Sequence, residues 1–143
     1  MLWLTRSHVH VDRVACPWLI KRFVDSEAKF LFVPKSQIDK VAAETGAIPF
    51  DAPGVELGHH HGKCSFETII EKYELTDPAL QHLAQIVHAA DIASELHTNE
   101  LAPGLEAIAT GFSLLLPDDH ANLQAQFIVY DALYALCRLQ VQQ

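Results

Sequence analysis

The chain has 143 residues, half of them hydrophobic, which predicts one compact domain over residues 1–143 with a substantial core. Its formal net charge of -8 repels phosphate backbones, which argues against direct binding of nucleic acid. The N-terminus becomes polar too soon for a signal peptide and no apolar run could cross a bilayer, so we expect a cytoplasmic protein without membrane contacts.

Three short segments in the first part of the chain have the composition of β-strands. Residues 2–5 alternate weakly, residues 29–33 are rich in aromatic and branched side chains, and residues 47–50 form a brief third segment. A proline follows the second segment and another lies in the third, which suggests edge strands because proline cannot donate to a ladder. We therefore expect a small N-terminal sheet.

An apolar stripe with three- and four-residue spacing lies between the first two segments and predicts a helix. Pro17 falls within the stripe, and proline is best tolerated in the first turn of a helix. We therefore expect the helix to begin with Cys16 as its cap. Asp12 and Arg13 would then lie on the connection that precedes the helix.

The rest of the chain is predicted to be mostly helical. A short helix is expected at residues 36–44, capped by Ser36 and ended by Gly46. Asp77, followed by a proline, and Asp118 are expected to cap two later helices. The helices expected after residue 64 run over residues 65–73, from 78 to about 90, over 103–115, and from 119 to 141. The expected fold is α+β, mostly helical with a small N-terminal sheet.

A thioredoxin-like N-terminal half followed by helices is the alternative fold. Cys16 before Pro17 resembles the start of the first helix in such folds, where the helix dipole favours a reactive thiolate. Ile48-Pro49 would supply the cis-proline that these folds use. Since no second cysteine of a redox pair is present, a buried structural thiol is the other interpretation of Cys16.

Residues 56–67 concentrate imidazole, thiol and carboxylate groups between glycines. If the backbone is extended, His59 and His61 project from the same face, and Cys64 follows beside a helix N-terminus. Nitrogen and sulfur donors of this kind suit a transition metal ion, here zinc or iron. We therefore predict a metal site formed by His59, His61 and Cys64, the other interpretation being an exposed loop without function. Supporting ligands are expected among Glu56, Glu67, His88 and Asp91.

Five blocks of sequence occur in an order that is more specific than any one block. The blocks are Val11 to Phe23, Ile48 to Asp51, His59 to Glu67, Ala89 to Asp91 and Tyr130 to Tyr134. Together they resemble the chromate-resistance domain called ChrB over most of the chain. The resemblance implies a role in bacterial tolerance to chromate or metal stress. Chromate is an oxyanion, so the partner would be either a metal ion or an oxyanion bound by cations. The cations available for an oxyanion are Arg13, Lys21, Arg22 and Lys63.

Two other functions remain open. One is a thiol-dependent reductase or transferase acting on chromate or a small substrate, with Cys16, Asp12 and Arg13 as the candidate catalytic residues. The other is a non-catalytic regulatory or dimerisation module. Its homodimer would form through the apolar face of the C-terminal helix, from Tyr130 to Cys137. The residue pattern leaves open whether any reaction is catalysed.

Overall fold

Three parallel strands form the expected N-terminal sheet in the computed structural model, which describes residues 1–143. The strands are β1 Leu2–Arg6, β2 Lys29–Val33 and β3 Ile48–Pro49. They lie in the order β2-β1-β3, with Leu4 paired to Leu31 of β2 and to Pro49 of β3. Because all three strands are parallel, their carboxyl ends meet at one edge of the sheet, where ligands commonly bind in folds with parallel sheets.

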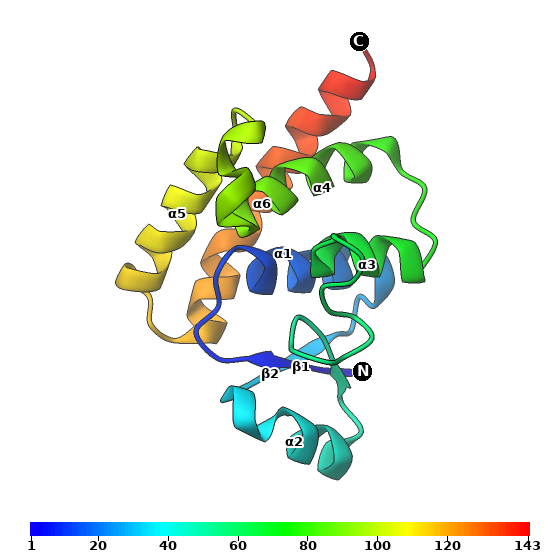
Figure 1. Ribbon diagram of the computed structural model, residues 1–143, viewed down its shortest axis with the longest axis vertical. Helices are drawn as coiled ribbons and strands as arrows, with labels where there is room; N and C mark the ends of the chain where they lie inside the picture. Colours follow the sequence, from blue (N-terminus) through cyan, green and yellow to red (C-terminus); the bar gives the residue numbers. More distant parts are fainter.

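Six α-helices make the protein mostly helical, which confirms the α+β fold expected from the sequence. They are α1 Val11–Leu19, α2 Ile38–Thr45, α3 Ser65–Lys72, α4 Pro78–Asp91, α5 Ala102–Leu115 and α6 Asp119–Val141. Three short turns accompany them, the π-helical η1 Ile20–Val24 and the 3-10 turns η2 Lys35–Gln37 and η3 Ala93–Thr98. Figure 1 shows α2 on one side of the sheet and the other helices on the opposite side.

Helix α1 begins earlier than predicted, at Val11 rather than after Cys16. Pro17 lies inside the helix, and the chain continues from α1 into the wider π-helical turn. Proline in a helix interior costs about 3 kcal/mol, but each fully buried large apolar side chain contributes about 1.5 to 3 kcal/mol, and α1 buries several. Packing therefore outweighs the proline, and Asp12 and Arg13 belong to the first turn of α1.

Of the other four predicted helix boundaries, three are confirmed. Gly46 follows α2 with a left-handed φ of 74°, as expected for a C-terminal glycine. Asp77 and Asp118 cap α4 and α6, each accepting a hydrogen bond of 2.9 Å from a backbone N–H of the first turn. Ser36 is not a cap, because the turn η2 intervenes and α2 begins two residues later.

The two features expected of a thioredoxin-like half do not occur. Every peptide bond is trans, including the bond between Ile48 and Pro49. Cys16 lies within α1 and not at its start, so its thiol is away from the positive end of the helix dipole.

Helix α1 is the centre of the larger core and contacts α3, α4, α5 and α6. Tyr130 and Cys137 of α6 are fully buried in this core, so the face predicted to form a homodimer is covered within the chain. Dimerisation through the C-terminal helix stays a prediction, and the exposed apolar side chains of α6 that it could use are Ile128, Leu136, Leu139 and Val141. None of the helices combines the length and apolar character needed to cross a bilayer.

Candidate metal centre

Three carboxylates and one imidazole meet near the carboxyl edge of the sheet, and we call Asp12, Asp51, His59 and Asp91 the Asp-His site. His59 Nε2 lies 3.4 Å from Asp12 Oδ2 and 3.3 Å from both Asp51 Oδ1 and Asp91 Oδ2. The Asp12 and Asp51 side chains are 0% and 4% exposed, and that of Asp91 is 17% exposed. The His59 side chain is 49% exposed, so it lies between the buried carboxylates and solvent.

Each member of the Asp-His site comes from a different element. Asp12 lies in the first turn of α1, Asp51 follows β3, and Asp91 is the last residue of α4. His59 belongs to the connection between β3 and α3. Asp51 has a left-handed φ of 46°, which aspartate tolerates better than most residues. Its backbone N–H donates to the Leu57 carbonyl at 2.9 Å, which closes the loop and returns His59 to the edge of the sheet.

Hydrogen-bond donors and one guanidinium offset the cost of burying the Asp12 and Asp51 carboxylates. Asp12 accepts hydrogen bonds from the backbone N–H groups of Ser65 at 2.8 Å and Phe66 at 3.2 Å, the first two residues of α3. Asp51 accepts a hydrogen bond of 2.7 Å from Ser65 Oγ and lies 3.4 Å from Arg13 Nη1. Because a helix N-terminus carries partial positive charge, these contacts favour ionised carboxylates in a buried place.

Burial and mutual contacts shift the pKa values of the four groups of the Asp-His site. Burial, followed by the charge of Asp51, raises the pKa of Asp12 to about 7 and also raises the pKa of Asp91. Burial acts to raise the pKa of Asp51 as well, but hydrogen bonds from His59 and Ser65 outweigh burial and lower this pKa. Hydrogen bonds to Asp12 and Asp51 raise the pKa of His59 to about 10. The imidazole is therefore itself a cation at neutral pH.

The raised pKa of His59 predicts a pH dependence of stability in the metal-free protein. The folded pKa of about 10 exceeds the ordinary value of 6.5, so the proton on His59 favours the folded state. This contribution is complete below about pH 6.5 and is lost as the pH rises through 10. Over that range we expect the melting temperature, measured by circular dichroism, to fall more steeply for the wild type than for His59→Ala. Equal slopes would contradict the expectation.

A second group of donors lies at the start of α3, and we call Cys64, Glu67 and His88 the Cys-His site. Each residue offers one ligand atom, and these atoms lie within 4.8 Å of one another. Cys64 precedes α3, and its backbone N–H donates to Glu67 Oε1 at 3.0 Å. His88 of α4 places Nδ1 2.5 Å from the same Oε1, and its Nε2 contacts Glu95. Burial raises the pKa of the Cys64 thiol well above its ordinary value.

The structure divides five of the seven predicted ligands between the two sites. His59 and Asp91 belong to the Asp-His site, where Asp12 joins them. Cys64, Glu67 and His88 belong to the Cys-His site. The geometry therefore does not support a single ion held jointly by the histidine loop and the cysteine.

The other two predicted ligands join neither site. His61 is exposed, and Glu56 is exposed and pairs with Lys72 at 3.1 Å. The expectation that His59 and His61 share one face required extended backbone. His61 instead has a left-handed φ of 53°, which breaks the alternation of side chains along the loop.

Of the candidate catalytic residues, Asp12 belongs to the Asp-His site, and Cys16 and Arg13 contact it. Cys16 is fully buried, and its Sγ donates to Asp12 Oδ1 at 3.4 Å. Burial, followed by the charge of Asp12, raises the pKa of Cys16 far above its ordinary value, which disfavours a nucleophilic thiolate. Arg13 donates from Nη2 to the His8 carbonyl at 2.9 Å while Nη1 faces Asp51. Asp12 is thus one of the three carboxylates of the site, and Arg13 pairs with another.

Sequence reasoning missed Asp51 and Glu95. Asp51 ends the Ile48 to Asp51 block and follows a strand of the sheet, and acidic residues after parallel strands gather at one edge. That position was a usable signal for a ligand. Glu95 lies in the turn η3, seven residues after His88, and the two side chains meet because the chain turns after the end of α4.

Comparison with known proteins places the chain in a family. The family described as ChrB, C-terminal domain, matches residues 3–137. Protein ChrB of Cupriavidus metallidurans is 37% identical over 133 residues, which cover 92% of this chain. The same match covers 39% of that protein, so the chain spans well under half of the length of its relative. No solved structure matches the chain.

Proposed function

Because the chain belongs to the ChrB C-terminal domain family, a chromate-resistance family, we propose that it binds a transition metal ion in the response to chromate or metal stress. The observation that carries the proposal is the convergence of Asp12, Asp51 and Asp91 on His59 Nε2. Buried carboxylates that share one partner are costly unless a positive charge lies among them. Protonated His59 supplies that charge in the metal-free protein, and a metal ion would take the place of the proton on Nε2.

The spacing of the donors fits an ion. Metal–ligand bonds of about 2.1 Å separate neighbouring ligand atoms by roughly 3.0 to 3.4 Å. The distances from His59 Nε2 to the three carboxylate oxygens are 3.3 to 3.4 Å, and the ligand atoms of Asp12, His59 and Asp91 all lie within 4.8 Å of one another, so side-chain adjustments would place these atoms around one ion. Asp12, His59 and Asp91 would hold the ion, and Asp51 would complete or orient this set while Arg13 balances its charge.

The donor types favour a particular class of metal. Imidazole suits zinc and iron, whereas carboxylates suit harder cations. Three of the four side chains at the Asp-His site offer oxygen ligands, so we expect the site to prefer iron over zinc. Trivalent chromium, the product of chromate reduction, is also a hard ion that prefers oxygen donors. Binding of that product would link the site to chromate stress.

The alternatives have weaker support. Each cation that could bind chromate directly already contacts an acceptor within the chain. These contacts are Arg13 with Asp51, Lys21 with the Ala28 carbonyl, Arg22 with Asp131, and Lys63 with Glu71. A thiol-dependent enzyme would need an accessible thiolate, but Cys16 and Cys64 are both fully buried. If the chain is instead a regulatory module that binds no metal, no substitution at the Asp-His site should change ion binding.

Replacing His59 with alanine tests the proposal. We expect the wild type to bind one equivalent of Mn(II), which serves as a hard, oxygen-preferring probe with a paramagnetic signal. His59→Ala should weaken this binding at least about tenfold, because it removes the donor that the three carboxylates share. Electron paramagnetic resonance distinguishes free from bound Mn(II) during a titration.

His61→Ala is the matched control, since His61 is an exposed imidazole in the same loop with no hydrogen-bond partner. It should bind Mn(II) as the wild type does. The proposal is wrong if the wild type binds no Mn(II), or if both alanine variants bind it equally well. If the expected difference between the variants is found, analysis of iron and zinc in the purified protein identifies the resident ion.

A further inference from the structure

We propose that Cys64, Glu67 and His88 form a second metal site, separate from the Asp-His site and selective for a softer cation such as zinc. The two sites share no ligand. The proposal goes beyond ion binding at the Asp-His site, because it assigns a thiolate-containing centre with a different metal preference.

The donors of the Cys-His site are close enough to hold one ion. Their ligand atoms lie within 4.8 Å of one another, and Glu67 Oε1 and His88 Nδ1 are 2.5 Å apart. A tetrahedral ion with bonds of about 2.0 to 2.3 Å separates its ligand atoms by roughly 3.3 to 3.8 Å. Rotamer adjustments of about 1 Å at Glu67 and His88 would therefore create the site, since both side chains are partly exposed.

Helix capping accounts for only part of this arrangement. The hydrogen bond from the Cys64 backbone to Glu67 Oε1 is a capping contact at the start of α3. It does not explain why His88, from a different helix, lies between Glu67 and Glu95. An imidazole with one nitrogen at a ligand cluster and the other at a carboxylate is the usual arrangement of a metal-bound histidine. Glu95 would orient His88 in this way.

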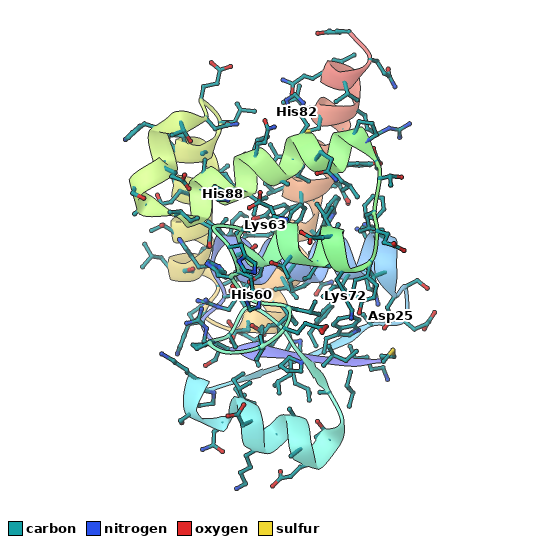
Figure 2. The ribbon with its side chains drawn as sticks, turned by 45° about the vertical axis from the view of Figure 1, so that its right-hand side comes forward. Asp25, His60, Lys63, Lys72, His82 and His88 are labelled. Carbon is teal, nitrogen blue, oxygen red and sulfur yellow. The ribbon has the colours of Figure 1, made fainter.

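The site has a route from solvent. A cavity of about 300 Å³ is lined by Glu67, Gln85, His88, Thr98 and Asn99, so an ion can reach the two partly exposed ligands. Cys64 lies at the closed side of the site, because it is fully buried. Figure 2 shows His88 on the part of α4 above the loop that carries Lys63, with His82 nearer the other end of that helix.

The protonated state of the thiol does not oppose binding. Burial raises the pKa of Cys64 when no cation is near, but a coordinated thiol is deprotonated by the charge of the metal. The proton leaves to solvent as the sulfur–metal bond forms, and no electron is transferred. The buried sulfur would become one of three or four ligands of the ion.

Titration with Co(II) tests the proposal, because a thiolate bound to Co(II) gives an intense charge-transfer absorption that oxygen and nitrogen ligands do not give. We expect this absorption in the wild type and its loss in Cys64→Ser. His88→Ala should weaken Co(II) binding at least about tenfold. His82→Ala is the matched control on the same helix and should behave as the wild type.

His59→Ala separates this proposal from the proposed function, since it should keep the cobalt–thiolate absorption while binding Mn(II) at least about tenfold more weakly. The second site is excluded if the wild type shows no such absorption, or if Cys64→Ser retains it through another cysteine. If Cys64→Ser does not fold, the comparison of His88→Ala with His82→Ala decides, and equal Co(II) binding by these two variants overturns the proposal.

Discussion

Replacing Asp12 with asparagine is expected to lower the free energy of unfolding by about 1 to 3 kcal/mol and to abolish ion binding at the Asp-His site. Asp12 is buried, and the groups within reach of its side-chain oxygens are all donors. They are the backbone N–H groups of Ser65 and Phe66, the thiol of Cys16 and the imidazole of His59. An amide must turn its own N–H groups toward one of these donors, which leaves buried polar groups unpaired.

Two measurements check this expectation. Urea unfolding followed by circular dichroism gives the change in stability, and Mn(II) titration gives the change in ion binding. Asp39→Asn, on the exposed surface of α2, is the matched control and should change neither quantity. Wild-type values for both quantities in Asp12→Asn would show that neither α3 nor the ion depends on this carboxylate.

Trp18→Ala is expected to be the most destabilising single change, with a loss of about 3 to 5 kcal/mol in the free energy of unfolding. The Trp18 ring is fully buried and packs against Phe23, Tyr130 and Tyr134, with ring centroids 5.7, 6.2 and 5.7 Å away. Its Nε1 donates to Asp131 Oδ1 at 2.8 Å. The substitution thus leaves a large cavity between α1 and α6 and removes a hydrogen bond.

Trp18→Phe separates these two effects. It keeps an aromatic ring in the core but cannot donate to Asp131, so we expect a smaller loss than for the alanine variant. Equilibrium urea unfolding by circular dichroism suits both variants, because it does not depend on tryptophan fluorescence. A loss below about 1 kcal/mol for Trp18→Ala would mean that the junction of α1 with α6 is not central to the core.

Local sequence patterns determined most of the secondary structure. The three strand segments, the aspartates at the starts of α4 and α6, and Gly46 after α2 all act through neighbouring residues, so they could be predicted without knowing the fold. The start of α1 could not, because Pro17 is unfavourable locally and only the burial of the whole helix compensates for it.

The sequence also identified most of the candidate metal ligands, since imidazole, thiol and carboxylate groups can be recognised from the residue types. Which of these ligands lie together in one site depended on the tertiary structure. Asp12, Asp51, His59 and Asp91 are brought together only because the end of β3, the loop that follows it, the start of α1 and the end of α4 meet in space. Spacing along the chain placed His59 with His61 and Cys64, but the left-handed backbone at His61 breaks the alternation of side chains, and Cys64 groups with Glu67 and His88 instead. Distances between side chains of different elements are set by the packing of the core, which no local pattern records.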